Sequence, residues 1–71
     1  MNKAMKQFKW DELTVRQKNA ARMFSEAHGT MSVSQCAKYL NYIFAYTSNN
    51  LTAEQFKAQT NHSVSDKWKV S

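Results

Sequence analysis

Hydrophobic positions along the chain recur mostly at helical spacing. The longest apolar-rich run extends from residue 33 to residue 47 and reads VSQCAKYLNYIFAYT. At 3.6 residues per turn, its apolar side chains other than tyrosine, Phe44 included, gather on one side, its tyrosines form a stripe beside them, and only a narrow polar strip remains. A helix that is apolar around most of its circumference must be covered around most of it. The pattern therefore predicts a central helix over 33–47, with the other segments packed around it.

The same short motif opens three predicted helices. In each, an apolar residue is followed by Ser or Thr, and a Gln stands three positions after the hydroxyl residue. The motifs are LTVRQ at 13–17, MSVSQ at 31–35 and LTAEQ at 51–55. This is the pattern of a capping box, in which the hydroxyl accepts from the N3 amide and the Gln side chain reaches back to the N-cap amide. It predicts helices that begin at Val15, Val33 and Ala53.

The predicted helix ends carry residues that tolerate a left-handed backbone. Gly29, the only glycine, ends a first helix over 15–28. Asn49 and Asn50 predict a turn after the central helix. The third helix is expected to be short, over about 53–59, with Phe56 as its large buried residue.

The two ends of the chain lack a clear helical pattern. Residues 1–10 fit either a helix, with Met1, Met5 and Phe8 at helical spacing, or an extended segment with Phe8 and Trp10 on one face. Residues 1–9 are basic, and we expect a loosely held arm that is anchored by Phe8 and Trp10. Near the C-terminal end, apolar and polar residues alternate from Val64 onward, which is strand spacing. A fourth short helical turn is the alternative, and Trp68 should order the tail in either form.

Length and composition agree with one small helical domain. The chain has 71 residues, of which 42% are hydrophobic, and it contains no proline. A chain of this length forms a single domain with a core of marginal stability. The predicted fold class is mainly α: a small three-helix bundle around the central helix, over residues 10–71, preceded by the basic arm of residues 1–9.

The candidate chemistry argues against enzymatic activity. Cys36 is the only cysteine, and it falls on the apolar face of the central helix, where cysteines behave as small inert hydrophobes. One cysteine and two separated histidines do not match the spacing of a zinc site, and a single glycine excludes a glycine-rich phosphate loop. We therefore expect a protein that is not an enzyme and that has no metal, no cofactor and no small-molecule substrate.

Net charge and apolar run length indicate the compartment and the kind of partner. The net charge of +5 favours anionic partners, such as nucleic acid, acidic proteins or membrane surfaces. No run approaches the roughly 18 apolar residues of a membrane span, and the basic N-terminus lacks the apolar segment of a secretory signal. Together with the single cysteine, which indicates a reducing compartment, these features predict a cytoplasmic protein without a membrane partner.

Two sets of side chains are candidates for a binding surface. The first is basic, and it would attract phosphates electrostatically, although an ordinary solvated surface is the commoner fate of such charges. Its members are Lys3, Lys6, Lys9, Arg16, Lys18 and Arg22. The second is the tyrosine stripe, which either fills the core or offers contact area to a protein or to unpaired bases. Its members are Tyr39, Tyr42 and Tyr46.

Residues 34–41, SQCAKYLN, resemble the first helix of a helix-turn-helix unit, in which an alanine packs closely and a leucine follows three residues later. The unit would need a tight turn after Asn41, whereas the apolar pattern continues, and the next predicted helix offers one Lys and one Glu. No base-reading role is therefore carried over from the resemblance.

These features predict a small nucleic-acid-binding protein that acts through backbone phosphates. The alternative is an inhibitor or adaptor that docks a larger protein through the tyrosine-rich helix over 33–47. Buried tyrosines together with basic side chains that share one face would favour the first alternative, and an exposed apolar patch of tyrosines would favour the second.

Overall fold

A computed structural model describes residues 5–27 and 31–68 of the chain. Within these ranges the regular structure is helical and no strand occurs. The α-helices are α1 (Val15–Ala27), α2 (Val33–Lys38), α3 (Leu40–Thr47) and α4 (Ala53–Thr60), and two short 3-10 turns are η1 (Trp10–Glu12) and η2 (Asp66–Trp68). The prediction of a small, mainly helical bundle is confirmed.

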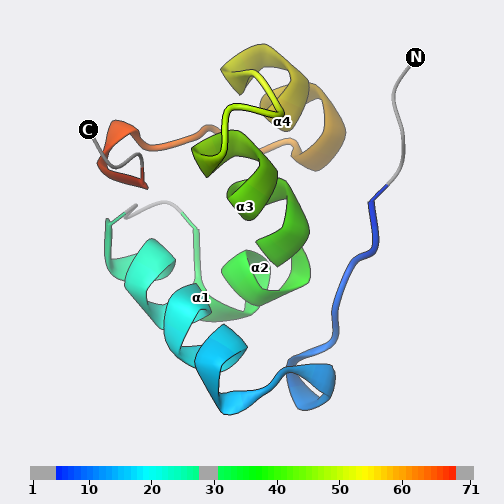
Figure 1. The fold of residues 1–71 in the computed structure, drawn as a ribbon, viewed down its shortest axis with the longest axis vertical. Coiled ribbons are helices and arrows are strands. Elements are labelled where there is room, and N and C mark those ends of the chain that lie inside the picture. Colours follow the sequence, from blue (N-terminus) through cyan, green and yellow to red (C-terminus); the bar gives the residue numbers. More distant parts are fainter. Residues whose placement is uncertain (1–4, 28–30, 69–71) are drawn as a thin grey trace.

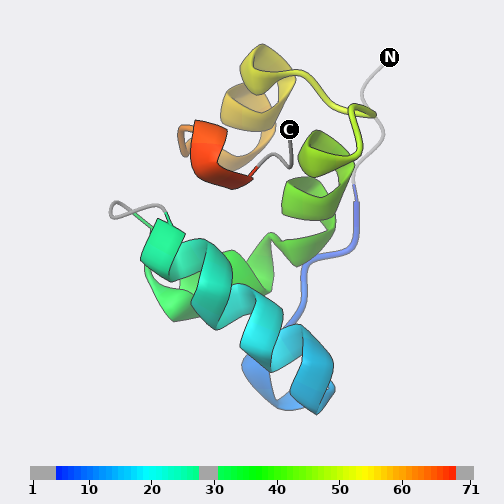
Figure 2. The same cartoon turned by 60° about the vertical axis from the view of Figure 1, so that its left-hand side comes forward.

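The helices pack around α2 and α3, which lie in the middle of the molecule (Figure 1). α1 packs against α2, α3 packs against α4, and η2 contacts α1. Seen from the side, α1 and α4 lie at opposite ends of the molecule (Figure 2). The largest fully buried side chains are those of Met31, Cys36, Leu40, Ile43 and Phe56.

All three predicted capping boxes are present. The backbone N–H of the Gln donates to the Ser or Thr hydroxyl at 3.2, 3.2 and 3.1 Å in chain order. The Gln side-chain oxygen accepts from the N-cap amide at 2.9, 3.1 and 3.0 Å. Each box satisfies two amides that a helix start would otherwise leave without partners. α1, α2 and α4 consequently begin at the predicted residues.

The central helix is interrupted, so the prediction of one continuous helix over 33–47 is wrong at Tyr39. This residue has φ −104° and ψ 25°, and it separates α2 from α3. The carbonyl of Lys38, which would accept from residue 42 in a continuous helix, accepts the N–H of Phe8 at 3.1 Å. A group that enters the hydrogen-bond ladder from outside is a recognised cause of a helix break.

The remaining helix ends largely follow the sequence pattern. Asn49 has a positive φ of 63°, as expected for the turn after α3, and Asn61 has a φ of 61° at the end of α4. α4 is one residue longer than predicted. α1 is described to Ala27, and the end signals predicted at 28–29 lie outside the described residues.

The C-terminal tail forms a 3-10 turn and not a strand. Trp68 is 4% exposed, and its Nε1–H donates to the carbonyl of Phe24 at 2.9 Å. The hydroxyl of Ser65 donates to the carbonyl of Ala27 at 3.1 Å. Both carbonyls belong to the last described turn of α1. The tail is therefore bound to the end of α1, and the prediction that Trp68 orders it is confirmed.

The N-terminal segment from residue 5 onward runs alongside α2 and α3 (Figure 1). Its backbone is bound at three points: Met5 to the hydroxyl of Tyr42, the Lys6 carbonyl to the side chain of Asn41 at 3.3 Å, and the Phe8 amide to Lys38. The described part of the arm is thus held more firmly than predicted.

Candidate functional site

Trp10 is half-buried at the start of η1, and two cationic side chains of α1 lie over its ring. The Nζ of Lys18 and the Cζ of Arg22 each lie 5.4 Å from the centroid of its indole ring. Residues four apart lie on the same side of a helix, and a cation over an indole face is attracted by the ring quadrupole. These three residues are referred to below as the tryptophan–cation cluster.

Local hydrogen bonds bring the indole against α1. In η1 the amide of Glu12 donates to the carbonyl of Lys9 at 2.9 Å, and the amide of Leu13 donates to that of Trp10 at 3.1 Å. The side chain of Leu13 is buried in the core, and the capping box of α1 follows at once. The chain therefore reverses within a few residues, which places Trp10 beside the helix that begins after it.

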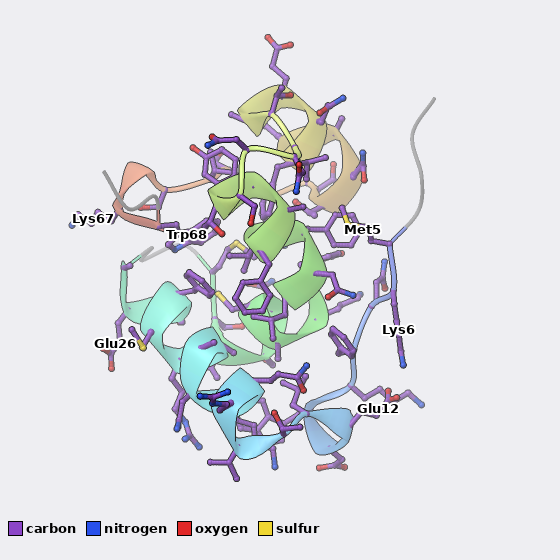
Figure 3. The ribbon with its side chains drawn as sticks, viewed as in Figure 1. Met5, Lys6, Glu12, Glu26, Lys67 and Trp68 are labelled. Carbon is purple, nitrogen blue, oxygen red and sulfur yellow. The ribbon has the colours of Figure 1, made fainter. Side chains whose placement is uncertain are left out.

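Few of the charges near this cluster are neutralised by a described carboxylate. Among the residues that the structure describes, the one ion pair joins Lys6 Nζ to Glu12 Oε2 at 3.8 Å (Figure 3). Both side chains are well exposed, so the pair contributes about 1 kcal/mol at most. Neither Lys18 nor Arg22 belongs to this ion pair. They carry like charges four residues apart, an arrangement that destabilises a helix by a few tenths of a kcal/mol.

The structure gathers only part of the predicted basic set. Lys18 and Arg22 meet at Trp10, while Lys9 is exposed on the adjoining segment. Lys6 lies over the ring of Phe8 at 5.3 Å. Arg16 is two residues from Lys18, which is about 200° around the helix, so it faces another side. Lys3 lies outside the described residues.

Two aspects of this site differ from the sequence analysis. The predicted solvent side of α1 is partly covered, because Lys18 is half-buried beside Trp10. The position of Trp10 beneath both cations was also not predicted. No sequence motif links η1 to the polar face of α1. Lys38, whose Nζ lies 5.3 Å from the ring of Tyr39, was likewise missed.

The tyrosine stripe is mostly core. Tyr42 and Tyr46 are 3% and 5% exposed, and the ring of Tyr46 packs against those of Phe56 and Trp68. Tyr39 is half-buried between Tyr42 and His62, with ring centroids 5.5 and 5.7 Å away. The docking of a larger protein through these three tyrosines stays a prediction, and the burial of two of them does not favour it.

Cys36 lies in the core, as predicted, with no exposed surface. Burial raises the pKa of its thiol to about 11, because the charged thiolate is poorly solvated there. The thiol is therefore protonated near neutral pH and is a poor nucleophile. The described residues contain no group of three or more His, Cys, Asp or Glu side chains that could hold a metal ion.

Comparison of the chain with protein-family models, with curated proteins and with solved structures gave no match. None of the described helices combines the length and apolar character needed to cross a membrane. The side chains around Trp10, and the charge of the surface that they form, are the features of this structure that indicate a function.

Proposed function

We propose that the protein binds nucleic acid through backbone phosphates, without enzymatic activity and with little sequence preference. The observation that carries this proposal is the tryptophan–cation cluster, in which two cations lie over one ring and neither forms an ion pair with a described carboxylate. A phosphate between Lys18 and Arg22 would offset their mutual repulsion. It would also accept charge-assisted hydrogen bonds from both side chains.

The two cations suit a phosphate in different ways. The guanidinium of Arg22 presents a planar set of donors that matches two phosphate oxygens, whereas the ammonium of Lys18 acts as a compact charge. The indole holds both side chains in place before a ligand arrives, which lowers the conformational entropy lost on binding. Contacts of this kind position a protein on a nucleic acid but do not read bases.

The charge around the cluster directs binding towards α1. Asp11 and Glu12 are exposed on η1, so the arm side of Trp10 is less positive than the α1 side. The net charge of +5 would add long-range attraction to any polyanion. A cytoplasmic location, where nucleic acid is abundant and a single cysteine stays reduced, fits this proposal.

The test is a titration of labelled single-stranded and duplex oligonucleotides at two salt concentrations, with two charge-reversal variants. Lys18→Glu and Lys57→Glu change the net charge equally, but Lys57 is exposed on α4, at the other end of the molecule from η1 (Figure 1). We expect Lys18→Glu to weaken binding and to reduce the salt dependence by about one phosphate contact, and Lys57→Glu to change neither greatly.

Circular dichroism of both variants shows whether they keep the helical fold. Absence of binding by the parent at low salt, where attraction to phosphates is strongest, would refute the proposal. Equal losses in the two variants would also contradict it, because net charge alone would then explain the binding.

A further inference from the structure

A groove of about 410 Å³ lies between α1, α3 and η2. Five of the described residues that line it are apolar, one is a threonine and one is a lysine. They are Met23, Phe24, Ala27, Phe44, Thr47, Lys67 and Trp68. The groove is separate from the tryptophan–cation cluster and contains none of its side chains.

Aromatic rings form the walls of this groove. The ring of Phe24 meets that of Phe44 edge to face, with centroids 5.7 Å apart and an interplanar angle of 75°. It meets Trp68 in the same way, at 5.7 Å and 72°. The hydrogen bond from the Trp68 indole to the Phe24 carbonyl fixes the third ring. Phe44 is nevertheless 41% exposed and Met23 is 69% exposed, so an apolar surface remains open to a ligand.

The dimensions of the groove favour a small ring system over a protein. Seven described residues line it, whereas a stable protein interface takes about 20–30 residues on each side. Its volume lies at the lower end of the range of about 300–1,000 Å³ for small-ligand sites. A second copy of the chain is further disfavoured, because both copies would carry a net charge of +5.

The charge of the groove favours a ligand that carries an anionic group beside its ring system. Among the described residues that line it, Lys67 is the only charged one, and its side chain points away from the body of the molecule, beside Trp68 (Figure 3). Glu26 is exposed in the last turn of α1 (Figure 3) and is not part of the lining. A flat aromatic ring with faces that can stack, joined through a sugar to a phosphate, is the chemistry of a nucleotide.

The groove and the tryptophan–cation cluster are neighbours on α1. Met23, in the groove, directly follows Arg22, in the cluster, so their side chains leave the helix about 100° apart. A flexible strand with a phosphate at Arg22 would thus have its next bases near the groove.

We propose that this groove binds one unpaired base of a single-stranded nucleic acid, stacked against Phe44, with an adjoining phosphate on Lys67. The inference rests on the proposed function and extends it from phosphate attraction to a preference for single strands. Base stacking on an aromatic side chain is tolerant of sequence, since every base has a π face. A duplex has no unpaired base to insert, so it would use the cationic cluster alone.

The test compares three probes of equal length: a single-stranded oligothymidylate, its duplex with oligoadenylate, and an abasic strand with the same phosphates. Phe44→Leu keeps a large apolar side chain at this position but removes the aromatic face. We expect it to weaken oligothymidylate binding about fivefold or more and to leave the other two probes unaffected. Val15→Ala is the matched control, because Val15 is 75% exposed on α1 and lies outside the groove.

Methionine methyl signals in NMR spectra provide a readout that does not depend on affinity. Oligothymidylate should shift the signal of Met23, which lines the groove, and leave that of Met31, which is 2% exposed in the core. The abasic strand should shift neither. An acidic amphipathic peptide that shifts Met23 when oligothymidylate does not would identify a protein-docking groove and overturn the proposal.

The two proposals fail in distinguishable ways. If Phe44→Leu binds oligothymidylate like the parent while Lys18→Glu binds it more weakly, the base-stacking groove is refuted and the phosphate contacts stand. If the abasic strand binds as tightly as oligothymidylate, the groove is refuted in the same way. If no probe binds the parent at low salt, both proposals are refuted.

Discussion

Replacing Tyr42 by phenylalanine tests whether one hydroxyl group holds the N-terminal arm on the helices. The Tyr42 hydroxyl accepts from the N–H of Met5 at 3.2 Å and donates to the carbonyl of the same residue at 3.1 Å. The ring itself is 3% exposed and would remain packed in the core. The substitution therefore removes two hydrogen bonds and leaves the packing almost unchanged.

The expected loss of stability follows from these two bonds. A hydrogen bond within a protein contributes about 0.5–1.5 kcal/mol net, so two would give roughly 1–3 kcal/mol. Met5 is half-buried, and its released amide and carbonyl regain water, which places the loss near the lower end, at about 1 kcal/mol. In a domain of this size that lowers the melting temperature by about 4–8 °C.

The assay is urea unfolding combined with amide hydrogen exchange, and Tyr39→Phe is the control. Tyr39 is half-buried on the same segment, and its hydroxyl forms no hydrogen bond with any described residue. Tyr42→Phe should unfold at a lower urea concentration than Tyr39→Phe. It should also speed the exchange of the Phe8 amide, whose bond to the Lys38 carbonyl depends on the position of the arm.

One result would refute this reasoning. If both variants unfold at the same urea concentration and the Phe8 amide stays equally protected, the hydroxyl does not hold the arm. The arm carries Lys6 and Lys9, so a released arm should also weaken nucleic-acid binding slightly, with the same decrease for every sequence.

Two further predictions concern the caps and the cysteine. Thr14→Ala, Ser32→Ala and Thr52→Ala should each lower the free energy of unfolding by about 1 kcal/mol, as measured by urea unfolding, and three variants as stable as the parent would contradict the capping boxes. Burial raises the pKa of the Cys36 thiol from 9.0 to about 11, so the unfolded chain releases this proton at lower pH than the folded one. The resulting stability is fully present below about pH 9 and is lost as the pH rises towards about 11; Cys36→Ala should lack this part of the decline, and identical pH profiles would place the thiol outside the core.

The helix starts could be read from the sequence because the forces that determine them are local. Each capping box joins a hydroxyl residue to a glutamine three positions later, and both hydrogen bonds form within one turn of helix. The same holds for the left-handed turn at Asn49, which depends on the low cost of positive φ for asparagine. The burial of Cys36 and Phe56 followed from helical periodicity alone.

The break at Tyr39 could not be read in this way. The segment over 33–47 has a continuous helical pattern, yet the Lys38 carbonyl accepts a hydrogen bond from Phe8 in the N-terminal arm. The form of the tail likewise depends on distant residues, because Ser65 and Trp68 donate hydrogen bonds to carbonyls in the last turn of α1. In both cases a distant segment supplied the partner of a backbone carbonyl.

The same distinction between local and long-range contacts applies to the candidate site. Lys18 and Arg22 were identified from charge and helical spacing, which depend on residues close in sequence. Their placement over Trp10 and the groove that Phe44 lines required the packing of η1, α1, α3 and η2. Hydrogen bonds within a turn are encoded in a few neighbouring residues. Contacts between segments depend instead on the free energy of the whole packed chain. For this reason, only the tertiary structure shows the position of the two cations over Trp10 and the groove.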